Sequence, residues 1–299
     1  MSKLLAVCFF SLILFSSSAI AKEVPPVKIA DDSISLVAGD NPLTVLYGFE
    51  GQCDFAYAVA TMGNSGSLDL TTLPADATVL AAYFISGFWF AQDLATHSMS
   101  FTFNGAGYGA VDAISVDTTT DDILDLAGFA VDVTSEVTGN ASYTYFAEGV
   151  EANFGDFGHL LAVVYSTPAL PYRALQLLAG AESLMGDSST ANFDLVGTGG
   201  GTLHVFTEAD QAGASSGEES ISFNGALVAG GPEADLFANN NGEYLSFLTY
   251  PVTLQEGTNS VTITTGEDWF GWHFAALVGP AGTVETERTS LGKLKSNYR

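Results

Sequence analysis

The chain has 299 residues, 47% of them hydrophobic, and 34 Asp and Glu residues against 8 Lys and Arg give it a formal net charge of −26. A body this acidic repels nucleic acid and anionic membrane surfaces, which argues against both as partners. The charge is explained either by solubility in a salty medium or by calcium binding.

The N-terminus has the pattern of a secretory signal peptide. Lys3 precedes an apolar stretch from Leu4 to Phe15, and Ala19 and Ala21 are the small residues that a signal peptidase needs. We expect residues 1–21 to be removed and the mature chain to be extracellular or at the cell surface, with the periplasm as the alternative. No later segment has the 18 or more apolar residues of a membrane span.

Cysteine then contributes little to stability. Cys8 leaves with the signal peptide, so Cys53 is the only mature cysteine and an internal disulfide is impossible. We expect Cys53 to be a buried, inert thiol; a reactive or intermolecular thiol is the alternative. Core packing must hold the roughly 278 mature residues together, a length that suits one large or two ordinary domains.

Strand signals follow one another along the whole mature chain. The runs are rich in Val, Ile, Thr, Tyr and Phe, often alternate with period two, and end at Gly, Asn, Asp or Ser. They are VLAAYFISG (79–87), MSFTFNG (99–105), ASYTYFAEG (141–149), LLAVVY (160–165), TLHVFTEAD (202–210), SISFNG (220–225), YLSFLTY (244–250), SVTITTG (260–266) and HFAALV (273–278). Two stretches could be helical: one turn within TLPADATV (72–79), and 172–186, which reads equally as a strand and loop.

The sequence FNGA occurs twice, at 103–106 and 223–226, and the surrounding landmarks repeat as well. Each copy is followed, 36 residues on from Asn104 and 35 on from Asn224, by a second Asn that opens another strand. Each half then places a Phe-Gly and a His, His159 or His273, just before an apolar strand. We interpret this as two homologous modules, residues 43–170 and 171–283, after a lead-in (22–42) and before a basic tail (284–299).

The recurring Asn and Gly residues are expected to be structural. An Asn-Gly pair tolerates the positive φ of a type I′ turn, which predicts tight hairpins at both FNGA copies. In the later loops, we expect Gly to relax the backbone and Asn to bond it. The residues concerned are Asn104, Gly105, Asn224 and Gly225 in the hairpins and Gly139, Asn140, Gly257 and Asn259 in the loops.

Asp132-Val133-Thr134, followed by Gly139 and Asn140, resembles a strand-end motif of jelly-roll modules of the galactose-binding type. The second copy keeps Val252, Thr253, Gly257 and Asn259, with Pro251 in place of the Asp. In such modules this motif is mostly architectural and does not mark the sugar site.

The order of the landmarks also resembles a family of secreted bacterial and archaeal β-domains of unknown function found in adhesin-like exoproteins. The matching stretches are Ala81–Gly87, Phe103–Gly105, Asp132–Thr134 and Leu161–Pro168. The two resemblances imply two tandem jelly-roll-like antiparallel β-sandwiches in a secreted surface or matrix module, with no established reaction.

Motifs of catalysis are missing from the sequence. There is no nucleophile elbow, H-E-x-x-H, paired Cys-x-x-Cys, phosphate-binding loop or EF-hand loop. We therefore expect a non-enzymatic protein, with a glycan-acting hydrolase as a less favoured alternative. No cofactor is expected except calcium, for which Asp121, Asp122 and Asp125 are candidate ligands.

Two aromatic clusters are candidate ligand-binding sites. Trp269 and Trp272 lie in DWFGWH, and Trp89 lies between two phenylalanines. Flat rings can stack on sugars, but they can equally fill a core or the seam between modules. The sequence thus predicts an adhesive or structural surface or matrix protein that associates with itself or other surface proteins, and a pair of carbohydrate-binding modules is the alternative. The basic tail, RTSLGKLKSNYR, could dock on an acidic neighbour.

Overall fold

The computed structural model describes residues 43–281 apart from 92–93, 95, 119–123, 155–157, 196, 209–218, 232–233, 238–243 and 267–269. Throughout these residues the regular structure is β-strand, every strand pair is antiparallel, and no helix forms. The all-β prediction is therefore confirmed. Within the same ranges nothing helical is long and apolar enough to span a membrane.

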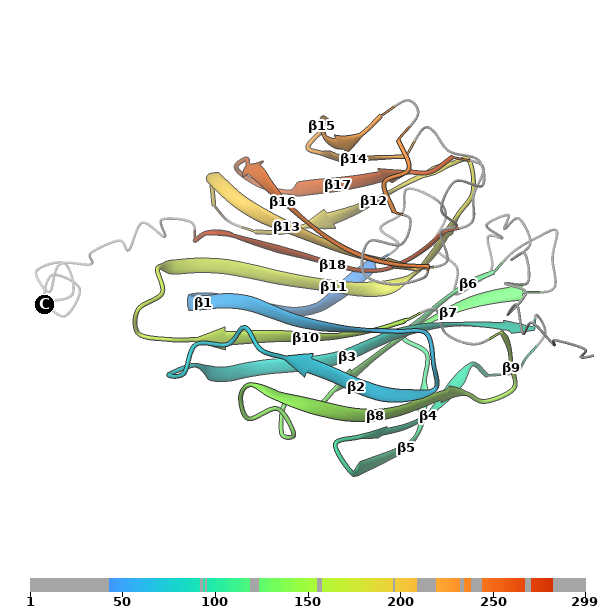
Figure 1. Cartoon of the computed structure of the whole chain (residues 1–299). Coiled ribbons are helices and arrows are strands. Elements are labelled where there is room, and N and C mark those ends of the chain that lie inside the picture. The colour runs from blue at the N-terminus through green and yellow to red at the C-terminus, as the bar shows by residue number, and fades with distance from the viewer. Residues whose placement is uncertain are drawn as a thin grey trace, which may run out of the picture.

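The strands fall into a first half and a second half along the chain (Figure 1). The first half holds β1 (Leu43–Thr61), β2 (Ser65–Leu70), β3 (Thr78–Ala91), β4 (Ser98–Phe103), β5 (Ala106–Asp112), β6 (Ser115–Thr118), β7 (Leu124–Asp132), β8 (Ala141–Gly149), β9 (Ala152–Phe154) and β10 (Gly158–Ser166). The second holds β11 (Tyr172–Leu184), β12 (Ser188–Phe193), β13 (Gly199–Glu208), β14 (Ser220–Phe223), β15 (Ala226–Gly230), β16 (Leu245–Leu254), β17 (Asn259–Thr264) and β18 (Phe270–Pro280).

The two halves repeat one strand order. A small sheet in the first half runs β2-β8-β4-β5, and its counterpart in the second half runs β12-β17-β14-β15. Outward from its middle, the large sheet runs β1-β10-β3-β7-β6 on one side and β11-β18-β13-β16 on the other. The corresponding strands come in the same sequence order, and the connection between β10 and β11 contains the predicted module boundary at 170/171.

Strand β1 joins the halves into one ten-stranded sheet. Its first part, from Leu43 to Gln52, pairs with β11, and its second part, from Cys53 to Thr61, pairs with β10. A register shift between Val45 and Tyr47 marks an irregularity in the β11 pairing. Because one strand hydrogen-bonds to both halves, the two units share backbone structure as well as side-chain contacts.

Three apolar clusters fill the molecule. One lies between the large and small sheets of the first half, around Phe84, Phe101 and Phe103, and the second lies between those of the second half, around Phe193 and Trp272. The third cluster draws on both halves and occupies the opposite face of the large sheet. Since β11 packs against β7 and β18 against β3 without hydrogen-bonding to them, the large sheet must turn this face onto itself.

Two glycines make the closest approach between the halves possible. Gly87 on β3 and Gly128 on β7 lie opposite each other in the ladder, so both leave space on the same face. The ring of His273 occupies the space above Gly87, and the backbone of Gly180 occupies that above Gly128. A Cβ atom at either position would overlap these groups, which explains why the sequence has glycine inside two otherwise apolar strands.

Two segments for which a helix was considered are not helical. Residues 172–184 form strand β11, so the strand alternative is the right one there. The stretch 72–79 contains a turn closed by the Ala77 amide donating to the Pro74 carbonyl, and β3 begins at Thr78. Strand β11 is buried on both faces. A strand between two packed layers needs no alternation of apolar and polar residues, which is why its composition resembles that of a helix.

We predict that Gly128→Ala destabilises the fold by about 3 kcal/mol, because the added methyl meets rigid backbone at Gly180 and forces strands apart. Urea unfolding monitored by tryptophan fluorescence measures this. Gly107→Ala is the matched control, because Gly107 also lies in a strand but a Cβ there meets nothing within 4 Å. Its free energy of unfolding should change by less than about 0.5 kcal/mol. Equal midpoints for the two variants would contradict the close approach.

Candidate functional site

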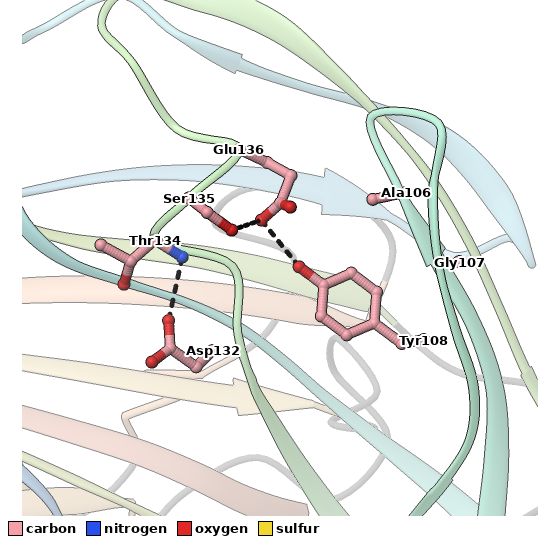
Figure 2. Close-up of a pocket in the computed structure, with 7 residues that line it drawn as sticks. All are labelled: Ala106, Gly107, Tyr108, Asp132, Thr134, Ser135 and Glu136. Carbon is pink, nitrogen blue, oxygen red and sulfur yellow. Dashed lines mark hydrogen bonds between the residues drawn. The ribbon is translucent and has the colours of Figure 1, made fainter.

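An open cavity of about 660 Å³ lies beside the first FNGA hairpin (Figure 2). One wall is the start of β5, with the Tyr108 ring, and the other is the loop that follows β7. That loop contributes four polar side chains, those of Asp132, Thr134, Ser135 and Glu136. Aromatic and polar groups from segments distant in the sequence thus face one hollow.

The hairpin wall is positioned by its turn. Asn104 and Gly105 have φ values of 48° and 85°, as a type I′ turn requires, and Phe103 pairs directly with Ala106. Phe101 and Phe103 are buried in the first core, which fixes β4 against the sandwich. Tyr108, on β5, is therefore held at the edge of the small sheet with its ring only partly covered.

The loop wall is anchored by hydrogen bonds at its start. The Asp132 carboxylate accepts the Thr134 amide proton at 2.9 Å, which turns the chain out of β7. The Thr134 hydroxyl oxygen accepts the Ala82 amide proton at 2.9 Å and so ties the turn to β3. Val133 and Val137 are buried beneath it, so the polar residues between them point outward.

A short hydrogen-bond network joins the two walls. The Tyr108 hydroxyl donates to Oε2 of Glu136 at 2.7 Å, and the Ser135 hydroxyl donates to the same oxygen at 2.7 Å. These two bonds, Ser135 first, lower the pKa of the Glu136 carboxyl. Burial, followed by the bond to Glu136, raises the pKa of the Tyr108 phenol. Near neutral pH, Glu136 is an ionised acceptor and Tyr108 a donor.

The chain belongs to the DUF3344 family. The family model, described as a protein of unknown function, matches residues 37–278, which include both walls of the cavity. The expectation of a β-rich domain of unknown function is therefore confirmed. No curated protein matches this DUF3344 chain.

Solved structures share only a remote likeness with the DUF3344 chain. A conserved protein of unknown function from Pseudomonas aeruginosa PAO1 is 12% identical with a TM-score of 0.30, over 75% of this chain and 79% of that one. The ANXUR2 extracellular domain from Arabidopsis thaliana is 8% identical with a TM-score of 0.30, over 81% and 90%. A beta-porphyranase of glycoside hydrolase family 86 from Bacteroides plebeius is 12% identical with a TM-score of 0.21, over 72% of this chain and 38% of that one.

The tryptophans predicted as sugar platforms lie inside the DUF3344 fold. Trp272 is fully buried in the second core, and its indole N–H donates to the Phe274 carbonyl at 3.1 Å. Trp89 is 1% exposed and alternates with Phe88 and Phe90, whose rings fill the first core, so it faces the seam between the halves. Neither ring forms a surface platform. Trp269 lies outside the described residues.

The calcium candidates are only partly visible. Asp121 and Asp122 lie outside the described residues, while Asp125 is buried, with its Oδ2 2.8 Å from Nε2 of His97. Within the described part of the chain, no three His, Cys, Asp or Glu side chains are grouped to hold a metal ion. Calcium binding at these three residues stays a prediction.

The recurring Asn and Gly residues serve the turns. Asn224 and Gly225 have φ values of 51° and 76°, so the second hairpin matches the first, and Gly257 has a φ of 89°. The amide side chain of Asn259 is buried and bonds the backbone of Gln255 and Gly257, and its Oδ1 also accepts from the Asn224 side chain at 2.8 Å. Asn140 instead bonds both backbone groups of Leu73, across 67 residues of sequence. Gly139 precedes it in extended backbone.

Three histidines are buried, and each has a polar partner on a neighbouring strand. Nδ1 of His159 lies 2.9 Å from the Ser86 hydroxyl, and Nδ1 of His204 lies 3.0 Å from the Thr249 hydroxyl. His273 has Nδ1 3.2 Å from the Gly180 carbonyl and Nε2 3.6 Å from Glu208, too long for a hydrogen bond. Burial lowers the pKa of His204 and His273 to about 4, so both are neutral near pH 7.

Cys53 is also buried, and burial, then the Asp54 carboxylate, raises the pKa of its thiol to about 11. The expectation of an inert thiol agrees with this environment, because only the thiolate is a good nucleophile.

Glu182 is a buried carboxyl that does not line the cavity. It is 1% exposed on β11; burial raises its pKa to about 8, and the Asp117 carboxylate adds to the effect. Asp117 accepts the Ser183 amide proton at 2.8 Å, which links β6 of the first half to β11 of the second. Glu182 is therefore mostly protonated at neutral pH.

We predict that Glu182→Gln makes the fold less sensitive to alkali. Below pH ~4.5 the carboxyl is protonated in both states, but from there to about pH 8 only the unfolded chain releases the proton, so stability falls as pH rises. The variant should gain on the order of a few kcal/mol over the wild type between pH 5 and pH 8.5. Urea unfolding at both values measures this, with Glu148→Gln, an exposed carboxyl on β8, as the control. Parallel pH profiles for wild type and Glu182→Gln would contradict it.

Sequence reasoning identified Asp132 and Thr134 as turn residues but missed Tyr108 and Glu136. Both lie next to landmarks that were recognised, Tyr108 two residues after the FNGA copy and Glu136 two after the D-V-T motif. The sequence shows two turns with polar residues, the FNGA hairpin and the D-V-T turn. Only the register of β4, β5 and β8 shows that these two turns are neighbours.

Proposed function

We propose that the protein is a secreted, non-enzymatic surface or matrix protein that adheres by binding hydroxyl-rich glycans in the cavity between the β4–β5 hairpin and the β7–β8 loop. The observation that carries this proposal is the Tyr108–Glu136–Ser135 network. It holds an ionised acceptor, a phenol ring and hydroxyl groups ready-made at the rim of an open hollow.

Sugar rings present adjacent hydroxyl donors together with an apolar face. A carboxylate accepts through two oxygens, and the Oε2 atom of Glu136 is already oriented by two donors. Tyr108 supplies an aromatic edge or face beside it, as aromatic groups in binding sites commonly do. The hydrogen bonds already hold these side chains in place, so a ligand has to order few of them. The entropic cost of binding is therefore low.

The same carboxylates argue against hydrolysis at this place. Glycoside hydrolysis needs one carboxyl with a raised pKa to protonate the leaving group. The pKa of Glu136 is lowered, and Asp132 is engaged by the Thr134 amide. The carboxyl with a raised pKa, Glu182, is buried away from the cavity. The cavity therefore suits a binding protein better than a hydrolase.

The proposal includes the finer architecture: two tandem jelly-roll sandwiches, residues 43–170 and 171–283, in a chain exported by residues 1–21. Eight strands in two four-stranded layers are typical of jelly rolls. The repeated strand order and the separate core of each half support the division. The shared strand β1 implies that the two modules act as one rigid platform for the cavity.

We expect Glu136→Gln and Tyr108→Ala to weaken glycan binding by about 10- to 100-fold, the effect of losing a hydrogen bond to a charged group. Binding is measured on a broad glycan array with the mature chain, residues 22–299, and affinity for any glycan retained is then measured by titration. Tyr108→Phe separates the hydroxyl from the ring and should have the smaller effect if the ring packs on the sugar.

Glu148→Gln removes an exposed carboxylate from β8 outside the cavity and serves as the charge-matched control. It should bind as the wild type does. If no glycan is retained on the array, or if all four variants bind equally, the cavity is not a glycan site.

A further inference from the structure

A second cavity, of about 310 Å³, lies in the second half, where β13 begins and β11 and β18 meet. Its lining differs in kind from that of the first cavity. Tyr172 and Arg173 at the start of β11 face the glycine run at the start of β13, and Pro280 closes the end of β18. Its volume is at the lower end of the range of small-molecule sites, which is roughly 300–1,000 Å³.

Arg173 gives this cavity a charge found nowhere else in the folded body. It is the only Lys or Arg between Ile29 and Glu287, in a chain with 34 acidic residues. A guanidinium carries five N–H donors and matches a carboxylate with two parallel hydrogen bonds. Within the described part of the chain, Arg173 is the only Lys or Arg side chain with which an anionic ligand could pair.

Asp54 on β1 orients the guanidinium. Its carboxylate accepts from Nη1 of Arg173, and the two side chains remain 28% and 31% exposed, respectively. Asp54 is not part of the cavity lining, so it holds Arg173 from the side. The remaining N–H groups of the guanidinium are available to a ligand, although the neighbouring negative charge limits the gain and makes the affinity moderate.

The remaining walls suit a sugar ring. Tyr172 is 61% exposed, unusual for a large aromatic side chain, and Thr202 adds a hydroxyl group. The floor includes Gly200, where a Cβ would meet nothing within 4 Å. The missing side chain therefore leaves open space in the cavity that Gly200 lines together with Tyr172 and Arg173.

We propose that this second cavity binds a carboxylate-bearing sugar, a uronic acid residue, with Arg173 on the carboxylate and Tyr172 on the ring. This site is separate from the glycan site of the first half and does not depend on it. The two cavities then differ in the ligand they select, because the first offers acceptors to neutral hydroxyls and the second a cation to an acid.

Titration of the mature chain with glucuronate, followed by calorimetry or ligand-observed NMR, tests the proposal. Glucose is the matched ligand, since it has the same ring without the carboxylate, and sodium sulfate is the anion without the ring. We expect glucuronate to bind with Kd of about 1 mM, corresponding to about −4 kcal/mol, and at least tenfold more tightly than glucose or sulfate. Added NaCl should weaken the binding.

Three variants locate the site. Arg173→Gln should abolish glucuronate binding, and Tyr172→Ala, a change at an exposed ring, should weaken it about tenfold. Gly200→Leu should block it by filling the open space, and far-ultraviolet circular dichroism and the Tm show that the fold is retained. Glu136→Gln, in the first cavity, should leave it unchanged.

The absence of glucuronate binding at about 20 mM would overturn the proposal. Equal binding of glucose would also overturn it, because the site would then not recognise the carboxylate. Equal binding of sulfate would overturn it because the site would then not recognise the sugar ring. Retention of affinity in both Arg173→Gln and Tyr172→Ala would place the ligand elsewhere and overturn it too. Loss in Glu136→Gln but not in Arg173→Gln would assign the acid to the first cavity and contradict the second site.

Discussion

The face-to-face packing of the two halves of the large sheet is the constraint on which the rest of the structure depends. Each half has its own core between its small sheet and its part of the large sheet, but the opposite face of the large sheet is also apolar in both halves. Such a face cannot be left in water, and each half covers that of the other. The rings of Phe55 and Tyr57 on β1 contact Phe247 on β16, with centroids 6.4 and 3.7 Å away.

The depth of this packing is set by the smallest residues in it. Gly87 and Gly128 face each other in the β3–β7 ladder and admit the His273 ring and the Gly180 backbone. Burial lowers the pKa of this imidazole to about 4, so the ring that fills the space is neutral near pH 7. His159, at the corresponding place before the apolar strand of the first half, bonds within its own half, to Ser86 and Gly63. The repeat is therefore symmetric in strand order and asymmetric at the seam.

Charge contributes little to holding the fold together. The body has one arginine, and its contact with Asp54 is partly exposed, a setting in which ion pairs stabilise proteins only weakly. Stability has to come from apolar burial and the strand ladders, while the many carboxylates keep the surface hydrated. At Glu182, burial, with the Asp117 carboxylate adding to the effect, raises the pKa to about 8, so this carboxyl keeps its proton near neutral pH. The acidity of the sequence thus reflects the solvent side of the molecule more than its architecture.

The sequence predicts the strands and turns well because those signals are local. Both Asn-Gly hairpins and the alternating strands follow from φ preferences and from period-two burial, and the repeat was visible through Asn140 and Asn259. Three features depend on distant contacts and were beyond local patterns. They are the division of β1 between two partners, the burial of Trp89 in the seam, and the bonding of Asn140 to Leu73. A tryptophan between two phenylalanines, as Trp89 is, looks the same in sequence whether it faces a ligand or another sheet.

The two cavities have different walls although the strand order of the two halves repeats. The Asp-Val-Thr turn that forms one wall of the first cavity corresponds to Pro251-Val252-Thr253, which lies inside strand β16 and makes no turn. The second half lacks that wall. Its cavity forms instead at the start of β13, where the glycine run leaves room beside Arg173. Strand β1 pairs with both halves, and the third apolar cluster packs them together. Both cavities lie at strand ends and loops, where the two halves differ although their strand order is the same.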